Sequence, residues 1–211
     1  MRRIYRETAY DLKEPGVHIW IIPLTALAFI VLTYFLQKNM NIDVLTLSLL
    51  EVLIPSLGGY GTIMLMQGLL DTEGGELGFA YPRSYLYWGL IRQFRFFILH
   101  SILTAAVCEA LALILHVDFL SLFYLTVIQS FAVMAVSFLG VIAGKKVSIG
   151  LIVLIAFIGI QLTLGREYNI FNRIYIINGA IPSHEQLNSV LYNSLFIGVF
   201  GWGIGQVWLR P

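Results

Sequence analysis

Six long apolar runs dominate this sequence and leave few folds open to it. Each run is about as long as an α-helix must be to cross the roughly 30 Å hydrocarbon core of a bilayer. The runs are continuous rather than alternating, which excludes the strands of a membrane barrel. The six runs are residues 17–36, 44–70, 96–115, 119–143, 147–164 and 187–208. We therefore predict an all-α, polytopic membrane protein with six transmembrane helices in one transmembrane domain, residues 1–211.

Charged residues make up only 12% of the chain and hydrophobic residues 58%, which excludes a soluble enzyme. The polar stretch 1–16 is expected to form a short helix on the membrane surface that ends at Pro15 and Gly16. Arg2 and Arg3 precede an apolar run, as in a signal peptide, but that run is too long for one. We therefore predict an uncleaved first span.

The lysine and arginine residues between the runs indicate the orientation. With a cytoplasmic N-terminus, ten of them face the cytoplasm: Arg2, Arg3, Arg6, Lys13, Arg83, Arg92, Arg95, Lys145, Lys146 and Arg210. Three then lie outside: Lys38, Arg166 and Arg173. Because basic connections stay in the cytoplasm, we predict that both termini are cytoplasmic.

The longest cytoplasmic connection, residues 71–95, is expected to contact another protein. It begins with three acidic residues, contains two adjacent glycines and a Tyr-Pro-Arg-Ser sequence, and ends with two arginines. These residues are Asp71, Glu73, Glu76, Gly74, Gly75, residues 81–84, Arg92 and Arg95. The connection resembles the first cytoplasmic loop of the six-helix permeases of ABC-2 type exporters, which carries acidic residues, a glycine, a short coupling helix and a proline before a basic residue.

The resemblance extends over nearly the whole chain in layout and over residues 71–95 in motif. It implies an ATPase-coupling element made of Glu73, Glu76, Leu77, Phe79, Tyr81 and Arg83. Its apolar members would fill a groove on an ABC ATPase, and its charged members would fix the register. The resemblance further implies two copies of that ATPase, which would bind ATP and Mg, so that this chain itself binds no cofactor.

The resemblance also implies a second permease chain, identical or related. The first and fifth helices often form the subunit interface in the resembled family. A face of the fifth span carries small and hydroxyl-bearing residues suited to close packing. We therefore expect a dimer seam at Ser148, Ala156, Gly159 and Thr163.

Two acidic residues lie within the apolar runs, where an ionisable group is costly unless it faces protein or water. Glu109 shares a helix face with Ser101 and His116, so we expect it to point into the bundle. Glu51 is close enough to the outer surface to be partly hydrated. Together with Thr62, these two acids are candidates for a translocation path; for Glu109 the alternative is a hydrogen-bonded helix contact, for example to a glutamine on a neighbouring helix.

Residues 165–186 form the longest outer connection and combine aromatic and branched apolar residues with polar ones. Such a segment is too polar to span the bilayer and suits a position in the interface or a re-entrant position inside the bundle. Both interpretations remain open from the sequence.

Enzyme signatures are absent: the sequence has no metalloprotease or serine-hydrolase motif and no Cys or His pairs at zinc spacing, so no catalytic or metal-binding residues are predicted. No nucleic-acid partner is expected. We expect a bacterial plasma-membrane subunit of an ATP-driven exporter that moves a small amphipathic molecule, peptide or lipid. The alternatives are an ion-coupled secondary transporter and a substrate-binding membrane subunit of a vitamin uptake system.

Overall fold

The computed structural model describes residues 20–39, 43–70, 86–163, 174–176 and 183–209, and these are almost entirely helical, with no strand among them. The all-α prediction is confirmed. The α-helices are α2 (Ile21–Asn39), α3 (Asp43–Leu70), α5 (Arg92–Leu115), α6 (Phe119–Gly144), α7 (Val147–Thr163) and α8 (His184–Trp208). A short π-helix, η2 (Tyr87–Ile91), leads directly into α5. The predicted surface helix and the predicted coupling element lie outside the described residues.

Four helical stretches are long and apolar enough to cross a membrane: Asp43–Gln67, Gly89–Leu115, Phe119–Gly144 and His184–Trp208. The apolar parts of α2 and α7 are shorter, 17 residues each. The chain is therefore of the helical membrane type that the apolar runs predict. The starts of two helices differ from the sequence prediction, because Arg92 begins α5 and His184 begins α8 with polar residues that precede the apolar runs.

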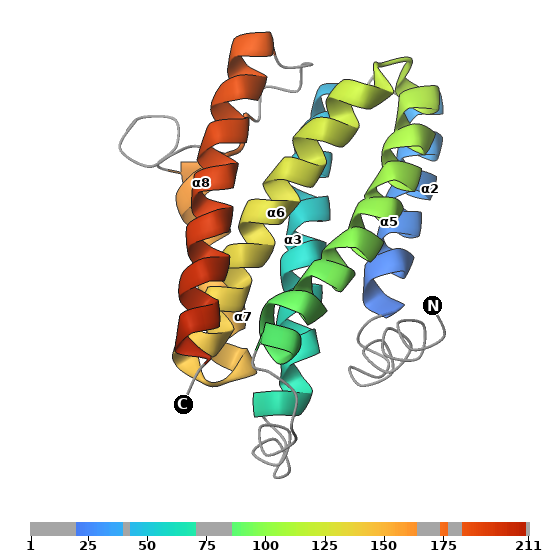
Figure 1. Cartoon of the computed structure of the whole chain (residues 1–211). Coiled ribbons are helices and arrows are strands. Elements are labelled where there is room, and N and C mark those ends of the chain that lie inside the picture. The colour runs from blue at the N-terminus through green and yellow to red at the C-terminus, as the bar shows by residue number, and fades with distance from the viewer. Residues whose placement is uncertain (1–19, 40–42, 71–85, 164–173, 177–182, 210–211) are drawn as a thin grey trace, which may run out of the picture.

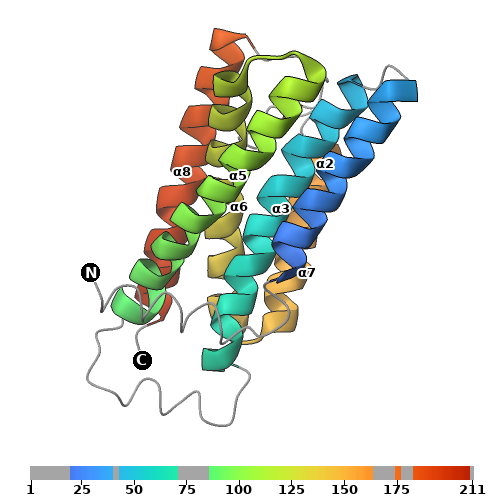
Figure 2. The ribbon, with the colours of Figure 1, turned by 90° about the vertical axis from the view of Figure 1, so that its right-hand side faces the viewer.

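The bundle is built around α3 and α6, whose apolar stretches are 67% and 78% buried. Helices α2 and α5 pack on one side of this central pair, and α7 and α8 lie on the other side (Figures 1 and 2). Helix α6 contacts α3, α5, α7 and α8. A side chain on α3 or α6 can therefore reach several neighbours at once.

Basic and acidic groups gather at opposite ends of the bundle. The start of α2, the end of α3, the start of α5, the α6–α7 turn and the end of α8 lie together (Figure 1). This end, called here the basic end, holds Arg92, Arg95, Lys145 and Lys146. The other end, called here the acidic end, holds Asp43, Asp118 and Glu185, together with Lys38 in the last turn of α2.

Polar caps define the starts of α6 and α8 at the acidic end. Asp118 accepts a hydrogen bond from the backbone N–H of Ser121 (2.8 Å) and caps α6. Hydrogen bonds from Ser121 lower the pKa of the Asp118 carboxyl. Ser183 and Gln186 form a capping box at the start of α8. Between α5 and α6 the chain reverses direction, and His116 in this turn takes a left-handed conformation (φ 55°).

Glycines let α8 approach α6 closely. A Cβ built on Gly201 would lie 3.1 Å from the backbone oxygen of Ala135, and one on Gly205 would lie 2.8 Å from the Phe138 ring. The opposite face of α8 is open, because a Cβ on Gly203 would meet nothing within 4 Å. Small residues at this spacing allow two helix backbones to pack tightly.

We predict that Gly201→Val lowers the stability of the protein, because its side chain would push α8 away from the α6 backbone. Overpacking of this kind costs typically ~1–3 kcal/mol. The matched control is Gly203→Val, two residues away on the exposed face of the same helix. Thermal unfolding in detergent should show a clear fall in Tm for Gly201→Val only; equal effects of the two variants would contradict the packing described here.

Candidate functional site

A cluster of buried polar groups lies inside the bundle toward the acidic end. Three helices contribute one side chain each: Glu51 from α3, Gln129 from α6 and Gln161 from α7. They surround residues 174–176, a short non-helical piece of the predicted outer connection. We call these three side chains and residues 174–176 the Glu51 cluster. At 1.5 Å per residue, Glu51 lies about 12 Å along α3 from its first residue.

The three side chains bond the backbone of residues 174–176. The N–H of Ile174 donates to Oε1 of Gln161 (3.1 Å), and its carbonyl accepts from Nε2 of Gln129 (2.9 Å). The N–H of Ile176 donates to Oε2 of Glu51 (2.9 Å), which also accepts from Nε2 of Gln129 (3.3 Å). Ile174 and Tyr175 have no exposed surface. Non-helical backbone at this depth must find its partners in the protein, and here helix side chains provide them.

The position of Glu51 differs from the sequence expectation of partial hydration. Its side chain is only 3% exposed, because residues 174–176 cover it. The two glutamines that contact this segment are also fully or nearly fully buried. The sequence gives no sign of this cover, since Glu51 and Ile176 are 125 residues apart.

Glu109 does not point into the bundle, and that expectation is wrong for the single chain. Its side chain is exposed. The buried face of α5 repeats at helical spacing through Thr104, Cys108 and Leu111, and Glu109 lies off this stripe. Ala112, three residues further along α5, is buried.

Thr62 lies apart from Glu51, eleven residues further along α3 and about 16 Å away by helical rise. It is fully buried, and its backbone carbonyl accepts from Nε2 of Gln93 (3.4 Å). The structure therefore does not bring Glu51, Thr62 and Glu109 into one site. Thr62 belongs to the contact between α3 and the start of α5.

His100 fills a notch in the middle of the bundle that sequence reasoning missed. It is 3% exposed, and its Nε2 lies 3.4 Å from Oγ of Ser130 on α6. A Cβ on Gly58 of α3 would lie 2.9 Å from the same nitrogen. The absence of a side chain on Gly58 thus leaves room for the imidazole of His100. The contact is visible only once the helices are packed together, because the spacing of histidines in the sequence does not indicate it.

A second polar contact joins the basic ends of α5 and α8. The backbone N–H of Leu90, within η2, donates to Oε1 of Gln206 on α8 (2.8 Å). Just beyond η2, Arg92 is 1% exposed, and the Arg95 guanidinium lies 5.0 Å from the centre of the Tyr87 ring. Gln206 was not singled out from the sequence, because a single glutamine near the end of an apolar run has no distinctive spacing.

No protein family model, curated protein or solved structure matches this chain. The candidate site therefore rests on the contacts described here. Among the described residues, no group of three His, Cys, Asp or Glu side chains is placed to hold a metal ion.

The predicted dimer seam on α7 faces outward in the single chain. Ser148, Ala156 and Thr163 are exposed, and a Cβ on Gly159 would meet nothing within 4 Å. The Thr163 hydroxyl donates to the Gly159 carbonyl (2.7 Å), so it needs no partner from another helix. This face is available for packing but is not covered by the described part of the chain.

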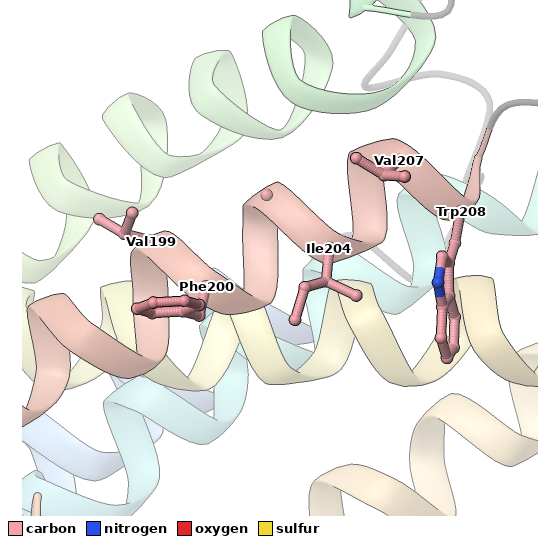
Figure 3. A pocket seen from close by; sticks show the side chains of 6 residues that line it. Val199, Phe200, Ile204, Val207 and Trp208 are labelled. Carbon is pink, nitrogen blue, oxygen red and sulfur yellow. The ribbon is translucent and has the colours of Figure 1, made fainter.

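The outer face of α8 carries a shallow apolar hollow of about 330 Å³ (Figure 3). Its lining consists of Val199, Phe200, Gly203, Ile204, Val207 and Trp208. None of these side chains offers a charged group, and all come from one helix. The hollow is therefore suited to contact with acyl chains rather than to polar recognition.

Proposed function

We propose that this chain is the transmembrane subunit of an ATP-driven, ABC-2 type exporter of a small amphipathic molecule, peptide or lipid. The observation that carries the proposal is the path of α3. This helix runs from the basic end, where the predicted coupling element follows it in sequence, to the Glu51 cluster inside the opposite half of the bundle. One helix therefore connects the place where a motor protein would act with a segment that closes the bundle.

Six membrane crossings fit this proposal. The 17-residue apolar parts of α2 and α7 reach the lower end of the length range for spanning helices. They pack side by side with longer helices that meet the length criterion fully. Four described basic residues lie at one end of the bundle, which favours a cytoplasmic position for that end and for both termini.

The internal features of α3 suit a helix that changes shape. Pro55 lies within it and removes one backbone donor, and Gly58 and Gly59 follow within one turn. In this mechanism a push at the basic end bends or shifts α3, Glu51 moves with it, and residues 174–176 lose an acceptor. The segment then leaves the bundle interior and opens a route to the outside. ATP hydrolysis occurs on the separate ATPase, and a second permease chain packs on the α7 seam.

The test is whether an ABC ATPase co-purifies with the chain from detergent extract. We predict that Glu76→Arg prevents this association and abolishes transport while membrane insertion is unchanged, because the charge reversal opposes docking of the coupling element. The matched control is Glu185→Arg, which reverses an exposed acid at the start of α8, at the other end of the bundle. Unchanged ATPase recovery with Glu76→Arg would contradict the coupling role.

A second candidate function, ion-coupled secondary transport, is favoured by one observation. Glu51 is a buried ionisable group within a spanning helix and bonds a non-helical segment, as coupling sites in such transporters do. The two functions are separated by collapsing the proton gradient while ATP is maintained. Transport that stops under this treatment would favour the secondary transporter.

A further inference from the structure

The contact between η2 and the end of α8 is unusual in its construction. A backbone N–H within a helix ordinarily donates to a carbonyl of the preceding turn. Here the side chain of Gln206, from a helix 116 residues further along the chain, supplies an acceptor to Leu90. Gln206 is 7% exposed, so this bond is shielded from solvent. This bond therefore links η2 directly to the last turns of α8.

Gly89 makes this connection possible. A Cβ at position 89 would lie 2.2 Å from Oε1 of Gln206 and 2.8 Å from Cδ2 of Leu209. Any side chain there would displace the Gln206 amide from Leu90. The π-helical turn in which Gly89 lies is a rare conformation that is frequent at functional sites.

Aromatic packing supports the same connection one turn further on. The Trp202 ring of α8 lies 6.5 Å from Phe94 and 6.2 Å from Phe97 of α5, both edge to face. Gln93, between η2 and these rings, bonds the α3 backbone at Thr62. The start of α5 is therefore tied to α3 on one side and to α8 on the other.

We infer that Gln206 is a positioning residue that passes displacement of the start of α5 to α8, so that α8 moves together with α3 during transport. This inference rests on the proposed function, because the displacement comes from the bound ATPase. It extends that function because α8 then also moves during transport. A mechanism that involves α3 alone requires no movement of α8.

The first measurement tests the bond itself and needs no ATPase. Hydrogen exchange is followed in peptides covering residues 86–93 of the chain in lipid nanodiscs. Gln206→Leu should accelerate exchange at the Leu90 amide roughly tenfold, because that amide loses its acceptor. Gly203→Ala, on the open face of α8, is the control and should leave the exchange unchanged. Unchanged exchange in Gln206→Leu would overturn the inference.

The second measurement follows the movement in the complex with the co-purified ATPase. Spin labels replace the exposed residues Leu113 of α5 and Asn188 of α8 in a Cys108→Ser background, and a second pair joins Leu113 to the exposed Leu45 of α3. ATP with orthovanadate should shift both distances in the parent. Gln206→Leu and Gly89→Ala should each remove most of the α5–α8 shift, and their combination should remove no more. The α3–α5 shift should persist in both variants. The Gly203→Ala control should show both shifts, as the parent does.

The outcomes separate the inference from the function on which it rests. An α5–α8 shift that persists in both variants, or that is missing in the parent while the ATPase is bound, overturns the role of Gln206 and leaves the exporter proposal intact. Failure of any ATPase to bind the parent chain refutes the exporter proposal, and the inference with it. If Gly89→Ala does not fold, the Gln206→Leu result decides alone.

Discussion

Replacing Glu51 by alanine should release residues 174–176 from the bundle and make position 176 reactive from the outside. The Ile176 N–H and the Gln129 amide would lose an acceptor within a buried environment. A buried donor without a partner costs about 1–3 kcal/mol, which corresponds to roughly 5- to 150-fold in the population of the released state. Labelling of an Ile176→Cys variant by a membrane-impermeant maleimide in intact vesicles should rise by a comparable factor.

The control for this prediction is Glu51→Gln. Its side-chain oxygen can still accept from the Ile176 N–H, so labelling should stay close to that of the parent. The native Cys108 has no exposed surface and should contribute little background. Equal labelling of the alanine and glutamine variants would show that the Glu51 oxygen does not hold the segment in place.

Replacing Trp202 by alanine should destabilise the protein more than any other truncation on α8. Trp202 is 5% exposed and contacts rings from two helices: Phe94 and Phe97 of α5, and Phe131 of α6 at 5.1 Å. Truncation of a buried tryptophan leaves a cavity and costs about 3–5 kcal/mol. In addition, the edge-to-face contacts between α5 and α8 are lost. Reversible unfolding in mixed micelles should report the change.

Trp208 provides the matched comparison, because it is on the same helix but 58% exposed. Its truncation removes the same atoms without opening a cavity between helices, so the change should stay within about 0.5 kcal/mol. Similar losses for the two tryptophans would mean that the aromatic contacts around Trp202 do not hold α8 to the rest of the bundle.

The sequence predicts the helices well because their signal is local. Continuous apolar runs predict the type and position of the long helices that the structure describes. Helix α3, for example, begins one residue before the expected residue and ends at the expected one. The sequence also predicts which charged residues share an end of the bundle. Arg92 and Lys146, for example, are expected at one end, and the antiparallel course of the helices brings them there. These features need no knowledge of which helix packs on which.

The polar contacts could not be predicted, because they depend on neighbours far apart in the chain. Glu109 and Glu51 look alike as acids within apolar runs, yet only Glu51 lies on a face that meets α6 and residues 174–176. Both faces contain small residues, so helical spacing cannot rank them. Gln206 likewise becomes significant only when the start of α5 is placed beside it. The predicted coupling residues stay a prediction.

The way in which residues 174–176 are held has a consequence for speed. The backbone bonds described above for Ile174 and Ile176 go to side chains of three helices. Breaking these bonds leaves the helical ladders of α3, α6 and α7 intact and requires only rotamer changes at Glu51, Gln129 and Gln161. Such an exchange can proceed within the microsecond-to-millisecond range of loop and lid movements. In the proposed exporter, release of this segment would therefore not limit the rate of transport.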